Sequence, residues 1–223
     1  MPKRVARRRS RIVVAAGTNG AGKSSIIGEF MEANGGAYFN PDTFARKLVD
    51  AGKPPEEANA IAWKTGFDGL RRAIDNHEDF SFETTLGGRS VAAELHRAIE
   101  EGCAVHIWYV GLASPDLHIE RVRARVSRGG HDIPVAKIRE RYPQSLSNLV
   151  SFIGKAAEIH VFDNTEENSS GLPRTKLIFR MRRSKIVEPD NEKLLATTPD
   201  WAKPIVAAAI QAGSRGRKAR KKK

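Results

Sequence analysis

Residues 17–24 read Gly-Thr-Asn-Gly-Ala-Gly-Lys-Ser, which matches the pattern G-x-x-x-x-G-K-[ST] in full. The segment follows a short β-branched run, residues 11–16, and precedes a stretch whose apolar residues recur with helical spacing. Glycines at this place let successive backbone N–H groups turn toward phosphate oxygens, and the following helix N-terminus adds positive potential. We therefore predict that the chain opens with a buried strand, a phosphate-binding loop and a helix.

The side chains of this loop indicate a nucleotide with a divalent cation. Lys23 supplies a mobile cation for the β- and γ-phosphates, and the hydroxyl of Ser24 can hold Mg²⁺. ATP and Mg²⁺ are thus the expected cofactors. The residues expected to bind them are Gly17, Thr18, Asn19, Gly20, Ala21, Gly22, Lys23, Ser24 and Ser25.

The rest of the chain alternates short apolar runs with longer stretches of helical periodicity. Strands are predicted at 11–16, 37–39, 80–82, 104–110 and 158–162, and helices at 41–50, 55–76, 90–101, from 115, 134–152 and 199–212. Residues 176–181 and 186–187 are predicted to pair as a late hairpin. This order predicts an α/β fold of the P-loop NTPase type, a five-stranded, mainly parallel sheet with helices on both faces.

The charge of the chain is concentrated at its two ends. The formal net charge is +12, yet residues 1–11 hold six basic residues and no acid, and residues 212–223 hold seven and no acid. Without these segments the body is close to neutral. We expect a basic disordered arm at 1–10, one domain at 11–212 and a basic disordered tail at 213–223, with nucleic acid the weaker candidate partner for such ends.

Two carboxylates follow predicted strands and should meet the phosphate loop. In open parallel sheets the ligand crevice lies beyond the carboxyl ends of the strands, where Asp42 and Glu83 stand. Phosphoryl transfer needs a group that orients and deprotonates the attacking hydroxyl, and Asp42 fits that role. Alternatives remain for both: Asp42 is also a candidate helix cap, and Glu83 a candidate magnesium partner.

Six arginines flank a glycine bend at residues 129–130. They are Arg121, Arg123, Arg125, Arg128, Arg139 and Arg141. Arginines on helices beside a glycine hinge are typical of a mobile lid that brings cations onto phosphates. Arg125 and Arg128 are the two that we expect to be catalytic, although arginine-rich helices are more often simply solvated.

With these residues in place, the chain resembles the zeta toxin family of P-loop kinases, whose characterised members phosphorylate UDP-N-acetylglucosamine. The matching segments lie between about residues 10 and 165: Gly17 to Ser25, Asn40 to Ala45, Phe82 to Leu86, Arg125 to Pro134, Arg141-Tyr142 and Ser145 to Leu149. The resemblance implies Lys23 at the phosphates, Asp42 as the base, and Glu83 with Thr85 on the substrate side. It further implies two phosphate-binding arginines, Arg125 and either Arg128 or Arg139, and an antitoxin protein as a candidate partner.

Three functions are therefore compared. The first is a kinase that phosphorylates a sugar nucleotide such as UDP-N-acetylglucosamine. The second is a phosphotransferase of the same type acting on an antibiotic or metabolite. The third is a nucleic-acid-associated NTPase that depends on the basic ends, and it predicts ATP turnover stimulated by RNA or DNA.

The remaining composition predicts a cytoplasmic protein. The single cysteine, Cys103, cannot form an intramolecular disulfide and lies in an apolar run, which favours a reducing compartment. No apolar stretch approaches the roughly 20 residues that span a bilayer. The histidines show no metal-ligand spacing, so zinc is not expected.

Overall fold

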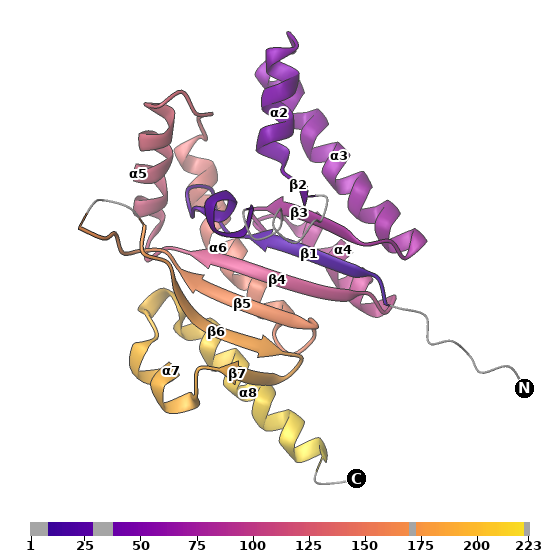
Figure 1. Ribbon diagram of the computed structural model, residues 1–223, viewed down its shortest axis with the longest axis vertical. Coiled ribbons are helices and arrows are strands. Elements are labelled where there is room, and N and C mark those ends of the chain that lie inside the picture. Colours follow the sequence, from indigo (N-terminus) through magenta and orange to yellow (C-terminus); the bar gives the residue numbers. More distant parts are fainter. Residues whose placement is uncertain (1–8, 29–37, 170–172, 221–223) are drawn as a thin grey trace, which may run out of the picture.

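The computed structural model describes residues 9–28, 38–169 and 173–220 (Figure 1). Its centre is one seven-stranded sheet with the order β2-β3-β1-β4-β5-β6-β7. The strands are β1 (Arg11–Ala16), β2 (Tyr38–Phe39), β3 (Phe80–Thr84), β4 (Ala104–Gly111), β5 (Glu158–Asp163), β6 (Lys176–Arg182) and β7 (Lys185–Glu188). The first five pair in parallel, and β6 and β7 continue the sheet in antiparallel register.

The predicted count of five strands was therefore wrong, because the late hairpin belongs to the main sheet. Met181 and Phe179 of β6 lie opposite Ile159 and Val161 of β5. These side chains are buried and extend the core of the parallel sheet. A hairpin can be predicted from its own sequence, but the strand that it pairs with is set by contacts through space.

Helices follow the predicted order with one addition. They are η1 (Ser24–Gly28), α2 (Pro41–Asp50), α3 (Pro55–Asn76), α4 (Arg89–Glu100), α5 (Pro115–Val126), α6 (Val135–Phe152), α7 (Asn191–Thr197), η2 (Asp200–Ala202) and α8 (Lys203–Arg220). The short α7 was not expected. The helix predicted after the phosphate loop is described only as the single wide turn η1, and its expected end at residues 34–36 lies outside the described residues.

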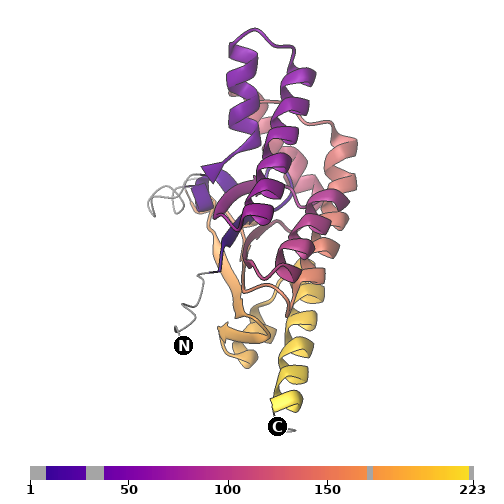
Figure 2. The same cartoon turned by 90° about the vertical axis from the view of Figure 1, so that its right-hand side faces the viewer.

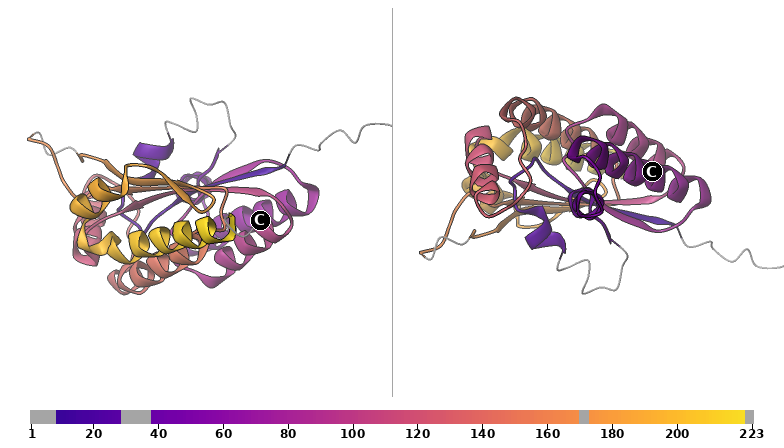
Figure 3. Two further views of the ribbon diagram at one scale, coloured as in Figure 1. Left: turned by 90° about the horizontal axis from the view of Figure 1, so that it is seen from below. Right: turned by 90° about the horizontal axis from the view of Figure 1, so that it is seen from above.

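The helices are distributed unevenly over the two faces of the sheet. Figures 2 and 3 show α3, α4, α6 and α8 on one face and η1 on the other. The larger core lies under the four helices and includes Leu70, Leu95, Tyr109 and Phe152. In the described part of the chain, no helix combines the length and apolarity needed to cross a membrane.

The tail predicted to be disordered from residue 213 is helical as far as it is described. Helix α8 continues without a break from Lys203 to Arg220. Its first half is anchored by the buried side chains of Ile205, Val206 and Ala209. Extending a helix that already exists costs little, and the Arg, Lys and Ala residues that follow are good helix formers with cations at the favourable end of the dipole.

Candidate active site

The phosphate loop has the curled backbone that its glycines predict. Gly17 has a φ of 139° and Gly20 a φ of 85°, both outside the range of ordinary side chains. A Cβ on Gly17 would lie 2.1 Å from the carbonyl oxygen of Val110, and one on Gly20 would lie 2.6 Å from that of His118. The loop is therefore packed against β4 and α5 so closely that only glycine fits at these positions.

Two side chains that the sequence analysis did not identify hold this loop in shape. Nδ1 of His118, on α5, lies 2.8 Å from the backbone oxygen of Asn19, and Nδ2 of Asn164, just after β5, donates to the oxygen of Ala21 at 2.9 Å. Burial lowers the pKa of His118 to about 4, with the charges of Lys23 and Arg121 acting in the same direction. The imidazole is thus neutral near pH 7 and donates its Nδ1 proton to the loop.

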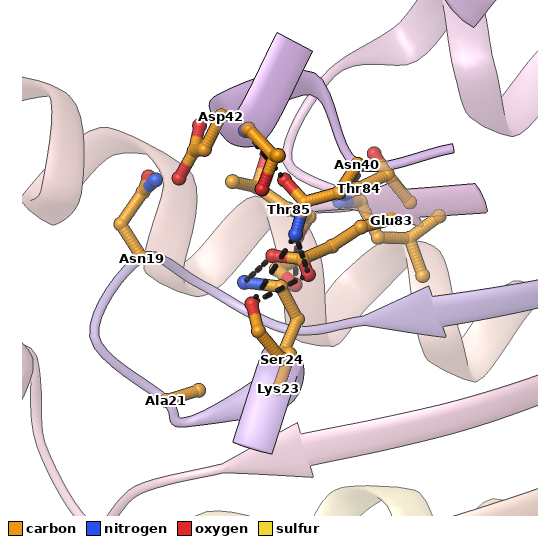
Figure 4. A network of polar contacts seen from close by, with 12 residues as sticks. Asn19, Ala21, Lys23, Ser24, Asn40, Asp42, Glu83, Thr84 and Thr85 are labelled. Atoms are coloured by element: carbon orange, nitrogen blue, oxygen red, sulfur yellow. Dashed lines mark hydrogen bonds and ion pairs between the residues drawn. The ribbon is translucent and has the colours of Figure 1, made fainter. Parts of the chain in front are cut away.

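The two cofactor-binding side chains of the loop meet Glu83 (Figure 4). Nζ of Lys23 lies 3.4 Å from Oε1 of Glu83, and the Ser24 hydroxyl donates to Oε2 at 2.8 Å. Oε2 also accepts hydrogen bonds from the hydroxyl of Tyr38 at 2.9 Å and Nδ2 of Asn40 at 3.0 Å. Glu83 is only 7% exposed, and a buried carboxylate needs such partners. Lys23 balances its charge, and the three donors satisfy Oε2.

A hydroxyl beside a carboxylate is a donor set suited to Mg²⁺, which prefers hard oxygen ligands and keeps several waters. Ser24 and Glu83 provide this pair, and a phosphate loop brings phosphate oxygens to the same place. The alternative of Glu83 as a magnesium partner therefore fits the geometry. No group of three or more His, Cys, Asp or Glu side chains suited to a metal occurs among the described residues.

Helix α2 carries Asp42 in its first turn, and Asn40 is the residue that caps it. Oδ1 of Asn40 accepts the backbone N–H of Thr43 at 3.1 Å. The alternative of Asp42 as the N-cap is therefore wrong, and its carboxylate, 47% exposed, does not cap the helix. Figure 4 shows Asp42 on the same side of the sheet as Lys23 and Glu83.

The arginines around the glycine bend have different surroundings. Arg125 lies with Nη1 3.7 Å from Oδ2 of Asp42, and its Nη2 donates to the oxygen of His131 at 2.8 Å. Arg139 pairs with the exposed Asp116 at 2.6 Å. Arg128 is exposed and, in the described part of the chain, does not line the cavity of the site.

Arg141 is the arginine that reaches the phosphate loop. Its Nη1 donates to Oδ1 of Asn19 at 2.9 Å, and its side chain packs against Gly87. Neither Arg128 nor Arg139, the two candidates for the second phosphate-binding arginine, has this position. The sequence analysis included Arg141 among the six lid arginines, but spacing alone did not separate it from the others.

The segment after β3 is held by helix α6. The Ser145 hydroxyl donates to the backbone oxygen of Thr85 at 2.7 Å, and Nδ2 of Asn148 donates to that of Leu86 at 2.7 Å. Leu86 has a φ of 52°, a conformation that needs such support in a residue other than glycine. These contacts fix Thr85, and with it the wall of the cavity.

Five of the predicted site residues line one cavity of about 740 Å³, whereas Ser24, Arg125 and Arg128 are not part of its lining. Its lining includes Lys23, Asp42, Glu83 and Thr85, together with Asn19 and Arg141. A volume of this size is typical of sites that bind a small molecule. Cofactor and acceptor residues predicted from separate strand ends therefore share a single site.

The fold and this site define a protein of the P-loop kinase class. The profile of the zeta toxin family matches residues 2–170. This chain belongs to the zeta toxin family.

Individual relatives are consistent with this assignment. An uncharacterized protein of Haemophilus influenzae is 29% identical over 133 residues, which are 60% of this chain and 93% of that protein. The AvrRxo1-ORF1:AvrRxo1-ORF2 structure with ATP has a TM-score of 0.59 at 15% identity over 86% of this chain and 64% of that one. The PezAT toxin-antitoxin structure of Streptococcus pneumoniae has a TM-score of 0.51 at 12% identity, over 94% and 88%. At these identities the two structures show a shared fold.

Proposed function

We propose that this protein is a kinase that transfers the γ-phosphate of ATP to a hydroxyl of a sugar nucleotide such as UDP-N-acetylglucosamine. The observation that carries the proposal is that Asp42 and Lys23 line the same cavity. A candidate base for the acceptor and a cation for the γ-phosphate thus face one space. Membership of the zeta toxin family and a structural relative solved with ATP support the choice of nucleotide.

Each residue then has a defined task. Lys23 and the inward-facing N–H groups of the loop bind the β- and γ-phosphates. Ser24 and Glu83 would hold Mg²⁺, which neutralises charge on the phosphates when it is bound. Asp42 accepts the proton of the attacking hydroxyl, and Arg125, beside its carboxylate, keeps that side chain directed into the site.

The acceptor occupies the part of the cavity lined by Thr85 and by the first turn of α2. Thr85 is fixed by Ser145, and the acceptor hydroxyl is then placed next to Asp42. Arg141 faces the same cavity from the lid side and can neutralise charge on the transferred group. The PezAT relative is a toxin-antitoxin system, and a protein antitoxin is the macromolecular partner that we propose for this chain.

The test is product identification by mass spectrometry after incubation of the purified protein with ATP, Mg²⁺ and a panel of UDP-sugars. We expect a product heavier by one phosphate. Asp42→Asn should retain ATP binding and slow transfer by about 10² or more, as loss of a positioned base does. Asp50→Asn, at the exposed far end of the same helix, is the matched control and should be as fast as the unmodified protein.

The outcomes separate the parts of the proposal. Phosphorylation of an antibiotic or metabolite, with UDP-sugars unchanged and Asp42→Asn still slow, would reject the sugar nucleotide and keep the kinase. Transfer at full speed by Asp42→Asn would reject the assignment of the base.

A further inference from the structure

Trp63 is a large aromatic side chain at the edge of the cavity. It lies on α3 and is 53% exposed, although it lines the cavity together with Phe67 and Leu70. These three residues recur at helical spacing, and their burial increases along the helix: Trp63 is exposed, Phe67 is half-buried and Leu70 is fully buried. One face of α3 thus rises from the core to the rim of the site.

The Trp63 ring stacks on a second aromatic ring, which covers one of its faces. Its centroid lies 5.0 Å from that of Phe67, with 10° between the ring planes. Because Phe67 covers one face and the side chain is still half exposed, the other face is accessible. A tryptophan held in this way has already lost much of its rotamer freedom, so a ligand that stacks on it orders little else.

Helix α3 gives this ring a fixed base. A Cβ on Gly66 would lie 2.6 Å from Cε1 of Phe39, and one on Gly69 would lie 3.1 Å from Cζ of Phe80. The glycines therefore let the helix sit directly on the aromatic side chains of β2 and β3. This close packing sets the position of Trp63 relative to the carboxyl end of β3, which carries Glu83, and to the end of β2, which leads into α2 and Asp42.

Polar groups surround the ring at the mouth of the cavity. One helical turn before Trp63, Nδ2 of Asn59 lies 3.4 Å from Nε2 of His131 in the bend between α5 and α6. Lys137 and Glu140 of α6 line the same cavity. Donors and acceptors at the edge of an aromatic platform are what a nucleobase requires, since it stacks with its face and forms hydrogen bonds with its edge.

A single exposed aromatic residue on a protein surface needs no explanation. Trp63 differs because it lines the candidate active site and is stacked on a second aromatic ring. The cavity, at about 740 Å³, is within the range of sites that hold a whole small molecule.

We propose that the nucleobase of the acceptor stacks on Trp63, which is the stacking platform and whose opposite face is covered by Phe67. This inference rests on the proposed function and assigns the specificity for a base-bearing acceptor to α3. The hydroxyl end of the acceptor is then directed to Asp42, and the base end is held between α3 and residues 131–134.

The test measures binding without turnover. Dissociation constants for UDP-N-acetylglucosamine, UDP and N-acetylglucosamine 1-phosphate are determined by calorimetry for the unmodified protein and for Trp63→Ala, Trp63→Leu and Trp63→Phe. Base stacking contributes about 1–3 kcal/mol per base, so Ala and Leu should weaken both uridine probes by about 5- to 150-fold. Phe should keep most of the affinity, and the base-free sugar phosphate should bind weakly to every variant.

The matched control is Leu195→Ala, which removes an apolar side chain that is 64% exposed on α7 and leaves the cavity lining intact. It should bind all probes as the unmodified protein does. ATP affinity should also be the same in every Trp63 variant, because the phosphate loop is unchanged.

Three results would overturn the inference. The first is an affinity of Trp63→Ala for the uridine probes within twofold of that of the unmodified protein. The second is full affinity of Trp63→Leu for these probes, which would make the contact merely apolar. The third is that the unmodified protein binds N-acetylglucosamine 1-phosphate as tightly as UDP-N-acetylglucosamine. The proposed kinase activity is judged separately by product formation and by Asp42→Asn, so failure of the platform and failure of the kinase are distinguishable.

Discussion

The hydroxyl of Ser24 donates a hydrogen bond of 2.8 Å to Oε2 of Glu83, a residue 59 positions further along the chain. This bond joins the end of the phosphate loop to the carboxyl end of β3. It places a carboxylate beside Ser24, the loop side chain that we expect to hold Mg²⁺. The resemblance to the zeta toxin family implies a role for Glu83 toward the substrate, whereas this contact favours a role toward the metal.

Glu83→Gln separates these roles, because it keeps the shape of the side chain and removes its charge. We expect the Mg²⁺ concentration for half-maximal turnover to rise at least about tenfold, since a carboxylate is a much better partner for the cation than an amide. The measurement is a magnesium titration of ADP release. A higher KM for the acceptor with an unchanged magnesium response would assign Glu83 to the substrate instead.

Tyr38→Phe is the control for that experiment. It removes one of the donors to Oε2 and leaves the charge in place. Its magnesium titration should stay within about threefold of the unmodified protein, since one neutral hydrogen bond contributes about 1 kcal/mol or less.

Gly17→Ala tests the close packing of the phosphate loop. The new methyl group would meet the carbonyl oxygen of Val110 at 2.1 Å, and the φ of 139° is strained for alanine. We expect ATP affinity to fall more than tenfold and the free energy of unfolding to drop by about 1–3 kcal/mol. Gly88→Ala, where nothing lies within 4 Å of the added carbon, should change neither quantity by much. Equal effects at both positions would contradict this account of the loop.

Arg141→Ala should reduce kcat/KM more than Arg128→Ala does. Arg141 donates to Asn19 and lines the cavity, whereas Arg128 is exposed. A cation lost from the site should cost about 10² in rate, and one lost from the surface about twofold or less. Steady-state kinetics of both variants gives the comparison. A larger loss in Arg128→Ala would mean that the α5–α6 bend moves so that Arg128 enters the site.

Much of the site could be predicted because its parts are local in the sequence. The phosphate loop is one continuous segment, Glu83 lies at the carboxyl end of β3, and Asp42 lies in the first turn of the helix that follows β2. A parallel sheet brings such strand ends to one edge, so their meeting follows from topology alone. The same argument extends to Asn164, which follows β5 and holds the loop through Ala21, although no motif marks it.

Other features depend on contacts between segments that are distant in sequence. The sheet has seven strands because β6 pairs with β5 through apolar side chains. The alternation of apolar and polar residues in β6 predicts a strand but does not specify its neighbour. Six arginines have similar sequence surroundings, and only the packing of α6 against Gly87 brings Arg141 to Asn19. Trp63 reads as one apolar residue of an amphipathic helix until α3 is placed beside the cavity.

The buried His118 makes the stability of the fold depend on pH. Its pKa is lowered to about 4 by burial, against about 6.5 in an unfolded chain, so the unfolded state binds the proton more readily between these values. This contribution to stability is therefore complete above about pH 6.5 and is lost as the pH decreases toward 4, by about 3 kcal/mol in total. His118→Asn cannot titrate in this range and keeps a side-chain N–H for the oxygen of Asn19. Urea unfolding at pH 7 and pH 4.5 should show a difference in unfolding free energy that is about 2 kcal/mol smaller in the variant. The same difference in both proteins would show that His118 is not the titrating group.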